Sequence, residues 1–216
     1  YTLFARSGPE KGSRGISAFL VEKDTPGLEV GPPERKMGLH GSVTTELRLN
    51  ELQLPAENRL GEEGQGFALA MSLLDGGRIG IAAQGLGLAG AALEETAAWL
   101  RSSSGGSGAA PGQGALFALA DLFTGLEAAR LLVYRAARLK EAGAPCSKEA
   151  SMAKTFATDL AVRAAVRCLD LWGREGMRTE NPLTRYFCDA KVTQIYEGSN
   201  QIQRLVIARE LLKNKL

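Results

Sequence analysis

The chain has 216 residues, 44% of them hydrophobic, which is enough to bury a substantial core in one or two domains. Its formal net charge of +2 comes from interspersed acidic and basic residues, and no lysine or arginine block indicates a nucleic-acid partner. No apolar run reaches about 18 residues, so we expect no transmembrane helix. Three widely spaced cysteines predict reduced thiols rather than a disulfide framework or a zinc site. A single histidine, His40, argues against His-rich metal chemistry.

The first 60 residues indicate β-structure. Short apolar runs at 16–21 and 47–49 alternate with turn signals such as Asp24-Thr-Pro-Gly27. The opening Tyr1-Thr-Leu-Phe-Ala5 is typical of the interior of a strand and not of a targeting peptide, so we expect the sequence to come from a longer protein. We expect a domain junction at 55–61, between a partial β domain (1–60) and a helical domain (61–216).

Helical periodicity begins at Gly66 and continues to about Arg101, carried by the apolar residues Phe67, Met71, Leu74 and Ile81. Three glycines inside this segment would each cost up to about 1 kcal/mol against alanine in an exposed helix, so we expect close helix packing at Gly85, Gly87 and Gly90. Further helices are expected at about 115–142, 147–171, 183–195 and 200–214, with a Gly/Ser-rich loop at 102–114 and a further loop at 173–182.

Two details of these helices are predicted as well. Ser147 is expected to cap the amino terminus of the third helix. The second helix is expected to bury one apolar face, made of Leu116, Leu119, Phe123, Leu126 and Val133. The fold class is therefore mainly α, an antiparallel helical bundle preceded by a partial β domain.

Five sequences occur in a fixed order along the chain: Gly15-Ile-Ser-Ala-Phe-Leu-Val21, Lys36-Met-Gly-Leu-His-Gly-Ser42, Leu74-Asp-Gly-Gly-Arg-Ile-Gly-Ile-Ala-Ala-Gln84, Lys148-Glu-Ala-Ser-Met-Ala-Lys154 and Asp189-Ala-Lys-Val-Thr-Gln-Ile-Tyr-Glu-Gly-Ser199. Together they resemble the carboxyl-terminal half of the acyl-CoA dehydrogenase family, nearest its short-chain and short-branched-chain members. The resemblance implies the second half of a β-barrel-like domain followed by the helical bundle. The family's first helical domain and first strands would lie before Tyr1.

The resemblance implies an FAD-dependent oxidation of a short or short-branched acyl-CoA to the trans-2-enoyl-CoA. A carboxylate removes the α-proton, the flavin takes a hydride from the β-carbon, and a backbone N–H and a flavin hydroxyl stabilise the thioester oxygen. The matching base is Glu197. A variant subgroup carries its base on the long helix, at the position of Gly77, which has no side chain here and so favours Glu197. The alternative role for Glu197 is to neutralise the amino terminus of the last helix.

The resemblance also implies a substrate site at Asp75, Gly76, Gly77, Arg78, Tyr196 and Gly198. Asp75 would hydrogen-bond the substrate and Arg78 would lie close to the base, although a solvated salt bridge on the helix is an equal alternative for Arg78. Tyr196 matches an aromatic residue of the acyl slot, and core packing is an equally good account of it. Gly198 permits close approach of the backbone to a ligand.

Three segments match regions of the family that contact FAD: Ser199, Asn200 and Gln201; Arg101 and Gln113; and Asp170, Leu171, Trp172, Gly173 and Arg174. The first begins a helix and suits a phosphate, with N-capping by Ser199 or Asn200 as the alternative. The second reaches the FAD of a neighbouring subunit, and Ser104 replaces its usual phenylalanine. In the third, the carboxylate of Asp170 replaces an amide, which is unfavourable near a pyrophosphate, and Arg174 adds a compensating cation. Cys188 replaces the arginine of a family Arg-Asp pair.

The family resemblance implies an electron-transferring flavoprotein as electron acceptor and a dimer of dimers with FAD at the dimer interface. It implies the mitochondrial matrix in a eukaryote and the cytoplasm in a bacterium. No metal site is expected. Two functions remain open. An active flavoenzyme is supported by Glu197 and the segment 75–78, and a non-catalytic assembly protein is supported by the altered flavin segments. We adopt the active enzyme as the interpretation to test.

Overall fold

The structure is a computed structural model that describes residues 1–102 and 111–213. These residues form two compact units. The first contains Tyr1–Lys36 and His40–Leu74, and the second contains Met37–Leu39 and the chain from Asp75 onward. The domain boundary expected near residue 60 stays a prediction.

The first unit is built from short antiparallel strands. β1 (Thr2–Arg6), β2 (Ile16–Leu20) and β5 (Arg59–Leu60) form a sheet in the order β1-β2-β5, and β3 (Leu28–Val30) pairs with β4 (Leu47–Leu49). Two 3-10 turns, η1 (Gly12–Gly15) and η2 (Ala56–Asn58), connect them. The β-structure expected for this part of the chain is confirmed, and its buried residues include Ser17, Ala18 and Val21.

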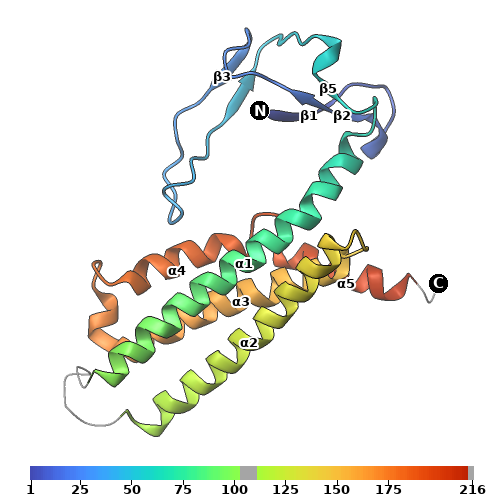
Figure 1. The fold of residues 1–216 in the computed structure, drawn as a ribbon. Coiled ribbons are helices and arrows are strands. Elements are labelled where there is room, and N and C mark those ends of the chain that lie inside the picture. The colour runs from blue at the N-terminus through green and yellow to red at the C-terminus, as the bar shows by residue number, and fades with distance from the viewer. Residues whose placement is uncertain (103–110, 214–216) are drawn as a thin grey trace. The chain divides into compact units, whose positions relative to one another are not determined.

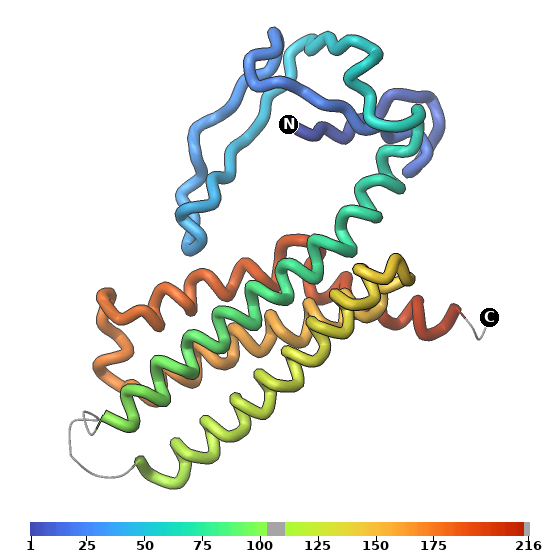
Figure 2. Tube along the Cα trace, in the orientation of Figure 1, coloured from blue at the N-terminus to red at the C-terminus, as the bar shows by residue number. Residues whose placement is uncertain are grey.

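The second unit is a helical bundle, as expected. Its elements are α1 (Gly66–Arg101, of which the first nine residues belong to the first unit), α2 (Gln113–Glu141), α3 (Ser147–Trp172), η3 (Gly173–Met177), α4 (Pro182–Thr193) and α5 (Asn200–Leu212). The three long helices α1, α2 and α3 run alternately in opposite directions (Figures 1 and 2). α3 is central, because it packs against α2, α4 and α5 and buries the most residues.

The bundle core is rich in alanine, which lets helix backbones approach closely. A Cβ on Gly85 of α1 would lie only 3.1 Å from the carbonyl oxygen of Ala157 on α3, so the close packing expected at Gly85 is confirmed. The same expectation is wrong for Gly87, whose Cβ would meet no described atom within 4 Å, and at Gly90 the nearest contact is an ordinary 4.0 Å.

The expectation for Ser147 is wrong, and that for the buried face of α2 is confirmed for Leu126 and Val133 but wrong for Leu116 and Phe123. Ser147 is the first residue of α3 rather than its cap, and its hydroxyl donates to Asp75 on α1. On α2 the buried positions are Leu122, Leu126, Ala129, Val133 and Ala136, a spacing of four and three that follows the helical repeat. Leu116 and Phe123 lie off this stripe and are 50% and 37% exposed, while Leu119 is packed against the core.

α1 is long and apolar enough to cross a membrane by length and composition alone, so the expectation of no transmembrane helix stays a prediction. This is weak evidence, because core helices pass the same test. α1 contributes Ala82, Ala89, Ala92 and Leu93 to the bundle core.

The cysteine expectation is confirmed: Cys146, Cys168 and Cys188 are all free thiols. Burial raises the pKa of the Cys146 and Cys168 thiols, which keeps both protonated at neutral pH.

Candidate active site

Glu197 lies in the turn between α4 and α5, in an unusual backbone conformation. Its φ is 55° and that of Gly198 is 90°, so two consecutive residues are left-handed. A left-handed glutamate costs about 1–2 kcal/mol and persists only where surrounding contacts enforce it. Those contacts are present: Gln203 Nε2 donates to the carbonyl oxygens of Glu197 at 3.2 Å and Gly198 at 3.0 Å.

The side chain of Glu197 lies against α1 at Gly77. A Cβ on Gly77 would lie 2.8 Å from the carboxyl carbon of Glu197, so a larger residue there would force the carboxylate to move. Glu197 Oε2 is buried and has no hydrogen-bond partner among the described residues. A buried carboxylate oxygen without a partner is costly, and such groups are characteristic of places where a ligand completes the bonding.

Arg78, the neighbour of Gly77, forms a buried ion pair with Asp75. The distance from Arg78 Nη1 to Asp75 Oδ1 is 2.8 Å, and the two side chains are 9% and 20% exposed. The salt bridge considered as an alternative is therefore present, but the expectation that it would be exposed to solvent is wrong. Ser147 donates to the other oxygen of Asp75, so both oxygens have a partner within the bundle. Arg78 Nε is buried without a partner among the described residues.

Tyr196 precedes the base and is half-buried. Its hydroxyl is hydrogen-bonded to the side-chain oxygen of Gln84 on α1. Burial raises the pKa of Tyr196 against the opposing effect of that hydrogen bond, so the phenol is neutral at physiological pH. The bond fixes the ring beside Glu197, and its role in lining an acyl slot stays a prediction.

Residues 64–212 match the family model described as acyl-CoA dehydrogenase, C-terminal domain. This chain belongs to the acyl-CoA dehydrogenase family. It is 53% identical over 213 residues to an acyl-CoA dehydrogenase of Bacillus subtilis, in an alignment covering 98% of this chain and 56% of the relative. The chain therefore spans little more than half the length of the curated relatives it matches.

Solved structures agree closely with the fold. The structure of butyryl-CoA dehydrogenase from Megasphaera elsdenii matches with a TM-score of 0.95 and 45% identity, covering 99% of this chain and 56% of that one. A chain in a structure of the electron transferring flavoprotein of Acidaminococcus fermentans matches with a TM-score of 0.94 at 45% identity, with the same coverage. An FAD complex of PigA matches with a TM-score of 0.91 at 28% identity, covering 97% of this chain and 55% of that one.

In this member of the acyl-CoA dehydrogenase family, one group of expected FAD residues lies beside Glu197, at the start of α5. Ser199 occupies the N-cap position but its side chain makes no capping bond, so the capping alternative is wrong for Ser199. Asn200 is 3% exposed, and its side chain bonds to Lys154, Thr158 and Asp159 on α3 rather than capping α5. Gln201 is exposed.

The other expected FAD residues lie at the opposite end of α4, where α1 and α3 end and α2 begins (Figure 1). Trp99 of α1 stacks on Trp172 of α3 with ring centroids 4.8 Å apart, which ties the end carrying Arg101 to Asp170, Leu171, Gly173 and Arg174. Arg101, Gln113, Asp170 and Arg174 are all exposed. Ser104 lies outside the described residues.

The two altered charges at this end have partners. Asp170 pairs with Arg167 at 3.2 Å, so a cation already offsets the carboxylate that replaces the family's amide. Arg174 pairs with Glu175 at 3.4 Å with its side chain 95% exposed. Asp189 is the aspartate of the family's Arg-Asp pair, in which Cys188 replaces the arginine. Its carboxylate accepts a 2.6 Å hydrogen bond from the backbone N–H of Leu39, which holds the segment around Leu39 against α4.

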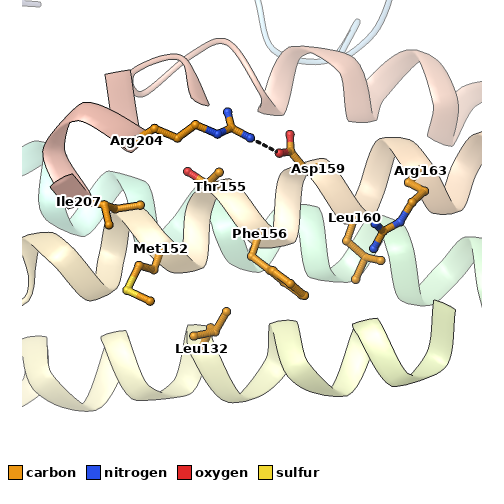
Figure 3. Close-up of a pocket in the computed structure, with 9 residues that line it drawn as sticks. All are labelled: Leu132, Met152, Thr155, Phe156, Asp159, Leu160, Arg163, Arg204 and Ile207. Atoms are coloured by element: carbon orange, nitrogen blue, oxygen red, sulfur yellow. Dashed lines mark hydrogen bonds and ion pairs between the residues drawn. The ribbon is translucent and has the colours of Figure 1, made fainter. Parts of the chain in front are cut away.

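A groove of about 400 Å³ lies on the face formed by α2, α3 and α5, with Arg204 reaching Asp159 across one side (Figure 3). None of the expected site residues lines it. The lining residues are Leu132, Met152, Thr155, Phe156, Asp159, Leu160, Arg163, Arg204 and Ile207.

Two side chains that hold the Glu197 turn, Lys154 and Gln203, had no role assigned from the sequence. Lys154 is the last residue of one of the family sequences, and it falls on the buried stripe of α3 beside Ala150, Ala153 and Ala157. A lysine on the apolar face of a predicted helix is the signal that could have identified it.

Proposed function

We propose that the protein carrying this chain is an FAD-dependent dehydrogenase that converts a short or short-branched acyl-CoA thioester to the trans-2-enoyl-CoA, with Glu197 as the base. The observation that carries this proposal is the buried, unpartnered Oε2 of Glu197, held against Gly77 in a left-handed turn. The carboxylate has space on α1 only because Gly77 has no side chain, and its free oxygen is available to a substrate C–H.

In the proposed reaction the α C–H bond breaks and its proton goes to Glu197, while the β C–H bond breaks with its electron pair and the Cα–Cβ double bond forms. The bound flavin supplies the acceptor for that hydride. The backbone N–H of Glu197 donates to the thioester oxygen and stabilises the charge that develops there. Arg78 contributes a buried positive charge beside the base.

The residues of this chain fit FAD in two groups. Ser199 and Gln201 offer polar side chains at the start of a 13-residue helix, which suits an anion. Arg101, Gln113, Gly173 and Arg174 are exposed at the opposite end of α4, where Asp170 is already paired. We propose that each FAD contacts one group from each of two subunits, so that the cofactor lies at a dimer interface.

The proposed assembly is a dimer of dimers, with an electron-transferring flavoprotein as electron acceptor. Large apolar side chains exposed on α2 support burial of this helix in an assembly, because contact with another subunit would remove them from water. Leu116, Phe117, Leu131 and Tyr134 are 50%, 61%, 71% and 58% exposed.

The test uses the full-length protein and the absorbance of its bound flavin. Butyryl-CoA and 2-methylbutyryl-CoA are added to the parent protein and to Glu197→Gln, which keeps the shape of the side chain and removes the base. We expect the oxidised flavin band to bleach in the parent, and at least about 100-fold more slowly in the variant.

Three results would contradict parts of the proposal. Equal bleaching in both proteins excludes Glu197 as the base. Bound flavin that neither thioester bleaches excludes the proposed substrates. A folded oligomer that binds no flavin in excess FAD favours the non-catalytic assembly protein.

A further inference from the structure

Lys154 is the largest fully buried side chain among the described residues, with 0% exposure. Lysine is almost never fully buried unless its charge is paired, because removing an ammonium group from water is costly. The proposed chemistry does not use this residue. Its burial therefore requires an explanation from its contacts.

The ammonium group of Lys154 joins α3 to the turn that carries Glu197. Its Nζ donates to the carbonyl oxygen of Gly198 at 2.9 Å and to Oδ1 of Asn200 at 2.8 Å. Asn200 is itself oriented by donating to Asp159 at 2.7 Å. Asp159 is held in turn by Arg204 at 2.8 Å, the pair drawn in Figure 3. A continuous polar network thus ends on the backbone directly after the base.

This backbone contact determines the position of Glu197. Its side chain has no hydrogen bond on Oε2 to hold it, so the direction of the carboxylate depends on the backbone turn. Gly198 follows it with a φ of 90° and has its carbonyl bonded to both Lys154 and Gln203. Loss of the Lys154 bond would free one side of a strained turn.

Lys154 keeps its charge at neutral pH despite its burial. Burial, together with the nearby charge of Arg78, lowers the pKa of Lys154 to about 8, and the charges of Asp159 and Glu197 oppose this shift. The ammonium is therefore still mostly protonated at neutral pH. The bond from this ammonium to the Gly198 carbonyl is therefore charge-assisted, which makes it stronger than a hydrogen bond between neutral groups.

We propose that Lys154 is a positioning residue for the base: it anchors the Gly198 carbonyl and thereby holds the Glu197 carboxylate against Gly77, where it meets the α-proton. This inference rests on the proposed dehydrogenase function. It assigns Lys154 no contact with substrate or flavin.

The experiment compares the full-length parent with Lys154→Met, which keeps the length of the side chain and removes its donors and charge. Flavin reduction by butyryl-CoA is followed in single turnovers and expressed per bound flavin, so that poorly folded protein does not count. We expect the rate to fall about tenfold or more, because small misplacements of a base are costly. KM should stay within about twofold, since the substrate contacts are unchanged.

A second variant separates positioning from a purely structural role. Lys154→Gln, measured in parallel, keeps an N–H donor without the charge, so it should recover part of the rate. The control is Lys148→Met, whose lysine lies in the first turn of the same helix and pairs with Glu149; it should behave as the parent.

The outcomes are distinguishable. A parent protein whose flavin no acyl-CoA bleaches overturns the proposed function and, with it, this role for Lys154. A parent that bleaches while Lys154→Met and Lys154→Gln reduce their bound flavin at the parent rate overturns the inference alone.

Discussion

Gly77 on α1 and Glu197 before α5 are in direct contact: a Cβ on Gly77 would lie 2.8 Å from the carboxyl carbon of Glu197. Gly77→Ala should therefore displace the carboxylate and lower kcat/KM by about 10–100-fold, because a misplacement of about 1 Å is enough for that loss. Flavin content should be that of the parent, since the three atoms nearest to that Cβ all belong to Glu197 and none to an expected FAD residue. Steady-state kinetics with butyryl-CoA and the flavin spectrum check both statements.

Gly80 provides the matched control for this substitution. It lies one turn further along α1, and a Cβ there would meet no described atom within 4 Å. Gly80→Ala should leave the kinetics unchanged and stabilise the helix by about 0.5–1 kcal/mol. Equal loss of activity in the two variants would show that the contact with Glu197 is not the cause.

The sequence predicted the helices well because their apolar repeats are long. α1 begins at Gly66 and ends at Arg101 as expected, and α2 and α3 differ from expectation by at most two residues at each end. The expectation that failed on α2 concerned which residues face the core. Leu116 and Phe123 are as apolar as their buried neighbours, and only the position of α3 decides which stripe is covered.

Gly85 and Gly87 of α1 allow the effect of close packing on stability to be distinguished from the effect of helix propensity. A Cβ on Gly85 would lie 3.1 Å from the Ala157 carbonyl oxygen and 3.2 Å from Cα of Thr158, and backbone atoms yield little. Gly85→Ala should destabilise the protein by about 1–3 kcal/mol through overpacking. Gly87→Ala, whose Cβ faces open space, should stabilise it by up to about 1 kcal/mol. Urea unfolding followed by circular dichroism measures both, and the same sign for the two variants would contradict the packing argument.

The stacked pair Trp99–Trp172 predicts a link between the bundle end and cofactor binding. Trp172 also donates from Nε1 to Thr96 at 3.1 Å, so two contacts on α1 fix the segment that follows. Trp99→Ala should lower the melting temperature and weaken FAD binding by up to about tenfold, since a stack contributes about 0.5–1.5 kcal/mol beyond burial. Trp99→Phe keeps an aromatic partner and should retain most of the affinity. Fluorescence titration with FAD gives both values, and unchanged affinity in Trp99→Ala would separate the stack from the cofactor.

The contacts inside the candidate site were beyond the sequence. Family resemblance pointed to Glu197 and Gly77, but the bond from Lys154 to Gly198 joins α3 to the turn after α4, and nothing in local spacing predicts it. Asp75 shows the same limit, because its second oxygen is bonded to Ser147 on a different helix. Such contacts depend on how helices are arranged, which a periodic pattern does not specify.

Lys154 also makes the stability of the protein depend on pH in a defined direction. Burial lowers its pKa from 10.5 to about 8, so between these values the unfolded chain holds a proton that the folded chain releases. The free energy of unfolding therefore increases by roughly 3 kcal/mol in total as pH rises through this window. Below pH 8 the folded protein bears the full penalty of the buried charge. Relative to Lys154→Met, the parent should become more stable between pH 7.5 and about 10.5. Urea unfolding of both proteins across that range measures the difference in their free energies of unfolding. Lys148→Met is the control, and its free energy of unfolding should follow that of the parent at every pH. Parallel pH dependences for the parent and Lys154→Met would contradict a lowered pKa for Lys154.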